Sequence, residues 1–127
     1  MSMVTALIVK PGCIPCEIQL DTDLQSLEKA VSLGTGMECS VRLMDLEKGV
    51  TMIHAWEGLS LGLPGNRRVK RRIIPGVFYV IGKDEDQQFR SLTEEEIRKY
   101  TKKYWNFRKY SEEEMINSWF DGLWLML

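Results

Sequence analysis

Two cysteines separated by two residues are the first feature of this chain that could do chemistry. Cys13 and Cys16 follow a short apolar run at residues 6–9, and their spacing is typical of thiol–disulfide exchange. That chemistry needs a thiolate at the start of a helix, where the helix dipole lowers the pKa of the thiol. Residues 16–21 alternate between apolar and polar types, which predicts a strand instead. A thiol redox protein using Cys13 and Cys16 is therefore the second alternative function.

The remaining candidate ligands and nucleophiles are sparse. Cys39 and the only histidine, His54, would complete a set of four zinc ligands, but only Cys13 and Cys16 have ligand spacing, so no metal site is predicted. No serine stands in a nucleophile-elbow pattern. The glycines at residues 58, 62 and 65 lack the lysine and hydroxyl of a phosphate-binding loop. The sequence predicts no catalytic residue and no cofactor, and favours a non-enzymatic protein.

Positive charge is concentrated in two short segments. Of the 17 lysines and arginines, five lie within residues 67–72 and six more within residues 98–109. Segments that shared one face would bind phosphates by counterion release. A nucleic-acid-binding module is thus the first alternative function, with candidate residues Arg68, Arg71, Lys99, Lys102 and Lys103. Against it, the net charge is -1, and acidic groups at residues 84–86, 94–96 and 112–114 can neutralise both segments.

Bulky apolar residues recur at helical spacing near the C-terminus, which predicts an amphipathic helix. Aromatic residues carry much of the energy of protein interfaces. Together with the loop and basic run before residue 73, this helix forms the predicted partner-binding surface, made of Asn66, Arg67, Arg68, Arg71, Arg72, Trp119, Phe120 and Trp124. The partner is an unidentified protein, and the helix is also a candidate homodimer interface. The other interpretation is that the helix covers the sheet as core.

The elements that must position these residues predict an α+β fold with a mostly antiparallel sheet, in the order β-β-α-β-β-β-α-α. Strands are expected at residues 6–9, 16–21, 37–44, 50–56 and 73–81, the last as a central strand covered on both faces. Capping-box patterns predict three helix starts, at Thr22, Thr93 and Ser111. We expect a single domain over residues 1–127, with residues 106–127 as a C-terminal helical extension.

Composition is that of an ordinary globular domain, with 44% hydrophobic and 28% charged residues in 127. No positive residue precedes the first apolar run, which predicts a first strand and not a signal peptide. The three cysteines fit free thiols in a reducing compartment. We therefore expect a cytoplasmic protein. No membrane association is predicted, because the polar face of the C-terminal helix is acidic and lacks lysine.

Five segments carry a resemblance to a known family. They are LIVKPG at residues 7–12, DLQSLEKAV at 23–31, GLPGNR at 62–67, IIPGVFYVIG at 73–82 and FRSLTEEEIRKY at 89–100. In this order and spacing they resemble the domain of unknown function 3846 family, small proteins of phages and conjugative elements, over about residues 4–105. The Cys13–Cys16 pair and the strongly basic run at residues 67–72 depart from the family pattern.

The resemblance implies a small α+β protein encoded among accessory genes, whose neighbours often include anti-restriction functions. The resemblance implies no particular enzymatic reaction. The leading hypothesis is an accessory protein of a mobile genetic element that binds a protein, with anti-defence activity as its specific form.

Overall fold

The computed structural model describes the backbone of residues 3–124 and the side chains of residues 3–120. It confirms an α+β protein with a mostly antiparallel sheet. The elements in chain order are β1 (Met3–Val9), β2 (Cys16–Asp21), α1 (Leu24–Val31), β3 (Val41–Glu47), β4 (Val50–Ala55), β5 (Gly65–Val69), β6 (Arg72–Pro75), β7 (Phe78–Lys83), β8 (Phe89–Arg90), α2 (Glu94–Lys103) and α3 (Glu112–Trp124).

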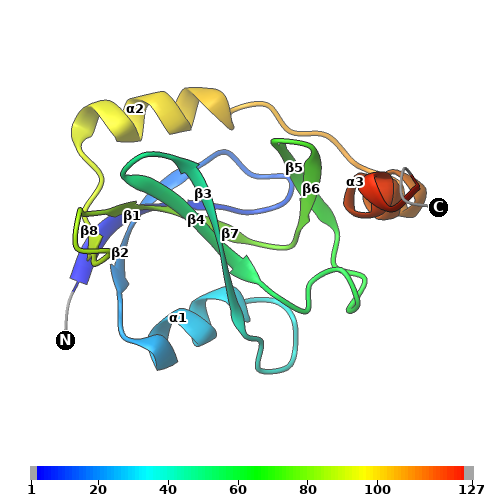
Figure 1. Cartoon of the computed structure of the whole chain (residues 1–127), viewed down its shortest axis with the longest axis horizontal. Helices are drawn as coiled ribbons and strands as arrows, with labels where there is room; N and C mark the ends of the chain where they lie inside the picture. The colour runs from blue at the N-terminus through cyan, green and yellow to red at the C-terminus, as the bar shows by residue number, and fades with distance from the viewer. Residues whose placement is uncertain (1–2, 125–127) are drawn as a thin grey trace.

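The main sheet has the strand order β2-β1-β7-β4-β3, and every pair is antiparallel. The short strand β8 pairs with one end of β7. Helix α2 lies on one face of this sheet and α1 on the other, so the body has three layers (Figure 1). Strands β5 and β6 form a separate two-stranded hairpin at one side, with α3 beyond it.

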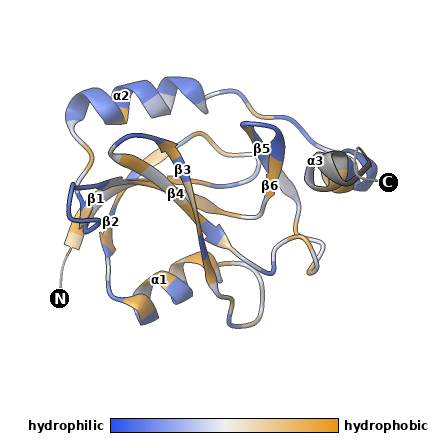
Figure 2. Cartoon of the chain, viewed as in Figure 1, coloured by the Kyte–Doolittle hydropathy of each residue, from blue (hydrophilic) through white to orange (hydrophobic). Residues whose placement is uncertain are grey.

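Alternate residues of the central strands face the two helical layers. On β7, Tyr79 and Ile81 belong to the core cluster that includes α1, whereas Phe78 and Val80 belong to the cluster that includes α2. The Tyr79 hydroxyl also donates to the carbonyl of Ala30 in α1, at 2.8 Å. Figure 2 shows the hydrophobic residues gathered on the sheet and the hydrophilic ones along α2. A strand covered on both faces explains the nearly continuous apolar sequence.

Local capping fixes where the helices begin. The Thr93–Glu96 box is present in full at the start of α2, and Ser111 and Glu114 make the same reciprocal hydrogen bonds before α3. The first helix starts one residue later than predicted, because the N-cap is Asp23 and not Thr22. The carboxylate of Asp23 accepts from the Ser26 N–H at 2.8 Å, which satisfies a free donor of the first turn.

The single strand predicted over residues 73–81 is wrong, because it is two strands. β6 ends at Pro75 and β7 begins at Phe78, with Gly76 between them in the left-handed region at φ 76°. The Gly76 N–H donates to the carbonyl of Pro64 at 2.8 Å, so the chain turns here to pair β6 with β5. An apolar run reports burial on both faces but not this change of direction.

The other strands also differ from the predicted order. β3 begins at Val41, four residues after the predicted start, and the segment GNRRV forms β5 where a loop was expected. Neighbouring strands pair as antiparallel hairpins in β1–β2 and in β3–β4. Within residues 3–124, no helix is long and apolar enough to span a membrane.

Candidate functional site

The exposed tip of the β5–β6 hairpin carries part of the predicted partner-binding surface. Arg68 and Arg71 are exposed on either side of a tight turn, and the Arg68 guanidinium donates to the Arg71 carbonyl at 3.1 Å. Lys70 in this turn has φ 57°, which a residue with a Cβ adopts only at a cost. The turn therefore holds a lysine and two arginines at the end of the β5–β6 hairpin.

Asn66 and Arg67 are removed from that predicted surface, because both side chains are buried. The Asn66 amide donates to the carbonyls of Val9 and Gly76 at 2.7 and 2.8 Å. Both residues belong to the GLPGNR segment, so this segment joins the hairpin to β1 and to the turn before β7. Sequence alone could not show this, because polar residues after Pro and Gly usually face solvent.

The Arg67 guanidinium donates four hydrogen bonds to acceptors of the chain itself. Its Nε donates to the Tyr104 carbonyl at 3.0 Å, and one terminal nitrogen donates to the Lys10 carbonyl and the Asn66 side chain. The other terminal nitrogen donates to the Cys13 carbonyl. Arg67 thus ties the β1–β2 loop and the end of α2 to β5. Burial lowers the pKa of this arginine.

Helix α3 packs mainly against β6, and its Trp119 also packs against the core cluster that includes α2, so the alternative interpretation of α3 as core holds for this one side chain. The Ser118 hydroxyl accepts from the Ile73 N–H at 3.0 Å, and the Trp119 indole N–H donates to the Ile73 carbonyl at 2.8 Å. On the outer side, Ile116 and Phe120 are 50% and 42% exposed. The predicted residue Trp124 ends the helix, but its side chain lies outside the described residues.

A small cavity of about 170 Å³ opens between the main sheet and α3. His54 on β4 lies opposite Arg42 on β3 in the strand pairing, and both side chains reach this cavity. The Arg42 guanidinium lies over two indoles, 4.5 Å from the ring centre of Trp56 and 5.0 Å from that of Trp119. Arg72 from β6 lies 4.7 Å from the same Trp119 ring.

His54 has a buried nitrogen without a hydrogen-bond partner among the described residues. Its side chain is 1% exposed, and Nδ1 lies 3.1 Å from the Ala55 carbonyl, which can only accept. In the neutral ring, Nδ1 therefore carries the hydrogen and Nε2 presents a lone pair with no donor. Burial, with the positive charges of Arg42 and Arg72, lowers the pKa of His54 to about 4.

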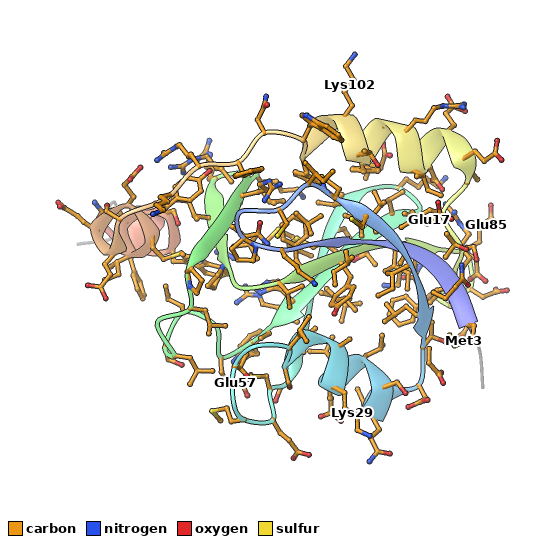
Figure 3. All side chains as sticks on the ribbon, turned by 180° about the vertical axis from the view of Figure 1, so that it is seen from behind. Met3, Glu17, Lys29, Glu57, Glu85 and Lys102 are labelled. Atoms are coloured by element: carbon orange, nitrogen blue, oxygen red, sulfur yellow. The ribbon has the colours of Figure 1, made fainter. Side chains whose placement is uncertain are left out.

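The residues of the predicted nucleic-acid surface fall into different settings. Lys99 forms an ion pair with Glu47 at 2.8 Å, and Lys103 lies over the rings of Tyr100 and Tyr104. Lys102 points away from the molecule (Figure 3). The Arg67–Tyr104 hydrogen bond brings the end of α2 against β5, so the two basic segments adjoin each other at that point.

The predicted redox cysteines stand apart from any helix start. Cys13 and Cys16 are exposed thiols, and Cys16 begins strand β2. Cys39 is buried in the cluster beneath α1, whereas His54 alternates with Ile53 and so faces the other side of the sheet. Among the side chains that the structure describes, no group of three or more His, Cys, Asp or Glu is placed to hold a metal ion.

Comparison with known proteins places the chain in a family. The profile of the domain of unknown function DUF3846 matches residues 4–105, and the chain belongs to this family. No curated protein and no solved structure gives a significant match. Arg42, His54, Trp56 and Arg72 lie within the matched residues, whereas Trp119 on α3 lies beyond them.

Sequence reasoning missed this cavity, since its residues come from four distant segments. A regular hairpin around Gly49 would not have found it, because the pairing of Glu47 with Val50 would continue to place Arg42 opposite Ala55. The register shift between Asp45 and Glu47 places Arg42 opposite His54 instead. The contribution of Trp119 had no signal either, because nothing local indicates that α3 packs on β6.

Proposed function

We propose that this chain is a non-enzymatic accessory protein of mobile genetic elements that acts in the cytoplasm by binding a protein of a host defence system. The resemblance to small proteins of phages and conjugative elements supports the genetic setting. The observation that carries the binding proposal is the outer face of α3, where Ile116 and Phe120 are exposed one helical turn apart.

This apolar pair has the surroundings of an interface. Helix α3 packs on β6, so the basic tip of the hairpin, with Arg68 and Arg71, belongs to the same part of the molecule. Protein interfaces commonly combine a desolvated apolar centre with a polar rim, and arginine and aromatic residues are enriched in them. In this proposal Ile116 and Phe120 supply the apolar centre, and Arg68 and Arg71 supply charged groups from the hairpin on which α3 packs.

The test is capture of partners by a tagged full-length chain, with nuclease treatment in parallel. We expect a protein that survives nuclease and is lost from the Phe120→Asp variant. The matched control is Leu24→Asp on α1, because Leu24 is also an exposed helical apolar residue, 67% exposed, in a different layer. Equal capture by both variants, or no captured protein, would overturn the proposal.

A nucleic-acid-binding module is the second candidate, favoured by the contact that joins the two basic segments at Arg67 and Tyr104. It requires that the purified chain bind DNA or RNA with a strong salt dependence. Changing Arg68, Arg71 and Lys102 together to alanine should then weaken binding and reduce the salt slope by about one per lost phosphate contact. Absence of binding at moderate salt would eliminate this candidate.

A further inference from the structure

The cavity between Arg42, His54 and Trp119 contains basic groups without an acid. No ion pair of the described side chains involves Arg42 or Arg72, and neither guanidinium has a hydrogen-bond acceptor there. The buried Nε2 of His54 is unpartnered in the same place. Buried polar groups are nearly always satisfied in folded proteins, so an unpartnered one in a cavity points to a missing partner.

Electrostatics define the sign of that partner. Burial and the charge of Arg72 lower the pKa of Arg42, and both arginines contribute to the low pKa of His54. Two like charges held near one indole raise the energy of the empty site. Arg42 lines the cavity and Arg72 lies nearby on the Trp119 ring, so an anion in the cavity would offset both charges and supply an acceptor to Arg42.

The orientation of the guanidinium groups suits a carboxylate. Arg42 lies over the Trp56 and Trp119 rings, so its faces are occupied and its N–H edges remain to donate. A guanidinium edge matches the two oxygens of a carboxylate in a fork-to-fork geometry. Trp119 is itself held by its hydrogen bond to the Ile73 carbonyl, which fixes the arrangement before any ligand binds.

The rest of the lining favours a carboxylate on a hydrocarbon chain over a phosphate. Ala55, Leu59 and Pro75 form apolar walls of the cavity beside the indoles. A phosphate dianion loses more hydration than a singly charged carboxylate on entering such walls, and it offers them no apolar surface in return. The volume of about 170 Å³ suffices for a carboxylate with a short chain.

We propose that this cavity binds a carboxylate on a short hydrocarbon chain, presented by the partner protein as an acidic side chain. This identification of the partner's chemistry rests on the proposed function. A free short-chain carboxylic acid carries the same group, so the experiment must separate the two sources.

Binding of a carboxylate takes up one proton from solvent. The lone pair of His54 Nε2 would repel a carboxylate oxygen, whereas the protonated ring donates to it. The charged groups that face His54 are Arg42 from β3 and Arg72 from β6, while β7 places Phe78 opposite it and α3 places Trp119. An anion in the cavity opposes the effect of these charges on His54, so binding should strengthen as pH falls from 8 to 6.

The probe is N-acetyl-glutamate N-methylamide, titrated into the ¹⁵N-labelled full chain and followed by NMR. We expect the indole N–H signals of Trp56 and Trp119 to shift and saturate. The matched control is N-acetyl-glutamine N-methylamide, which has the same shape without the charge. The variant Arg42→Gln/Arg72→Gln should weaken binding at least tenfold, whereas Arg98→Gln, an exposed arginine on α2, should leave it unchanged.

Several outcomes would overturn the proposal. Equal shifts with the glutamine probe, or unaltered binding in the double variant, would remove the carboxylate site. Tighter binding of methyl phosphate would replace carboxylate by phosphate as the ligand chemistry, and tighter binding of propionate would point to a free acid and not a partner protein. Binding that does not change between pH 6 and 8 would remove the protonation of His54.

Failure of this inference is distinguishable from failure of the proposed function. If Phe120→Asp abolishes partner capture while the Arg42→Gln/Arg72→Gln variant retains it, the protein-binding function stands and the cavity is not its contact. If the glutamate probe binds but no protein is captured, the carboxylate site stands and the function falls.

Discussion

Two arginines on the same hairpin, Arg67 and Arg72, occupy opposite situations. Arg67 is 3% exposed and donates to three backbone carbonyls and one amide oxygen. Arg72 lies over the Trp119 ring and has no acceptor among the described groups. Arg67 belongs to the GLPGNR segment, through which the family was recognised, and it serves the fold.

The difference separates residues that identify the family from residues that can act on a partner. Arg67 uses four of its five N–H donors inside the chain, which leaves it little capacity for a ligand. Among the described side chains that line or adjoin the cavity, Arg42, Arg72 and His54 are left without a partner. Of these three, only Arg72 belongs to the surface predicted from the sequence to bind a partner. The free hydrogen-bonding capacity at the cavity therefore lies beside the most recognisable segment and not in it.

The largest expected effect on stability comes from removing Arg67, the arginine that is hydrogen-bonded within the chain. Arg67→Ala leaves three carbonyls without their donor and should lower the free energy of unfolding by at least about 3 kcal/mol, because each charged hydrogen bond contributes about 1.5–3 kcal/mol. Arg67→Lys should recover less than half, since one ammonium cannot span three segments. Urea unfolding measures both, with exposed Arg68→Ala as the control. A loss under about 1 kcal/mol for Arg67→Ala would contradict the conclusion that Arg67 ties the β1–β2 loop and the end of α2 to β5.

A smaller effect should appear in the pH dependence of stability. The pKa of His54 is about 4 in the folded chain, against an ordinary 6.5, so the unfolded chain binds a proton that the folded chain does not. The free energy of unfolding should thus fall as pH decreases from about 6.5 towards 4, by on the order of 2 kcal/mol above pH 4.5. Urea unfolding of wild type and His54→Gln checks this, and parallel curves would refute it.

The carboxylates act in a lower pH window, which keeps the two effects apart. The pKa of Glu96 is lowered to about 2, first by the Arg90 guanidinium, so its contribution is present above pH 4.5 and lost as pH falls towards 2. Loss of stability between pH 6.5 and 5 is consequently assigned to His54.

Removing the hydroxyl of Ser118 should have an effect of about 1–2 kcal/mol. Ser118→Ala leaves the buried Ile73 N–H without its acceptor and loosens α3 from β6. Thermal and urea unfolding give the change, and hydrogen exchange should show faster exchange at the Ile73 amide. Asn117→Ala, at the exposed neighbour, is the control. Unchanged exchange at Ile73 would show that the hydroxyl does not hold this edge.

The smallest effect on stability is expected at Arg72, the arginine without a hydrogen-bond acceptor. Arg72→Gln removes one of two like charges and no hydrogen bond, so the free energy of unfolding should change by no more than about 0.5 kcal/mol. The same change should raise the pKa of His54, because Arg72 is one of its causes. NMR titration of the His54 ring measures this shift. A destabilisation comparable to that of Arg67→Ala would erase the distinction between the two arginines.

Local patterns in the sequence predicted the helix starts well, because capping at Thr93 and Ser111 involves residues three apart. The same patterns could not predict the break at Gly76, since apolar residues continue on both sides of it. Fold class followed from the order of the predicted strands and helices. The insertion of β5 and β6 as a separate hairpin depended on contacts that no local pattern contains.

The site was less predictable for a related reason. The partners of Arg67 lie 37, 54 and 57 residues away, and all three are backbone carbonyls, which leave no trace in residue type. The prediction of an exposed basic loop therefore misplaced Arg67 and Asn66. The predicted exposure of Arg68 and Arg71 agrees with the structure, because both side chains flank the tight turn at the hairpin tip.

The contacts of α3 with Ile73 have a consequence for self-association. In a strand, the N–H and C=O of one residue point to the same neighbour, and here both are engaged by side chains of Ser118 and Trp119. Helix α3 thereby closes the open edge of β6, which would otherwise invite a strand from another copy. A short hairpin whose edge is occupied in this way can present its basic tip in a crowded cell without seeding edge-to-edge aggregation.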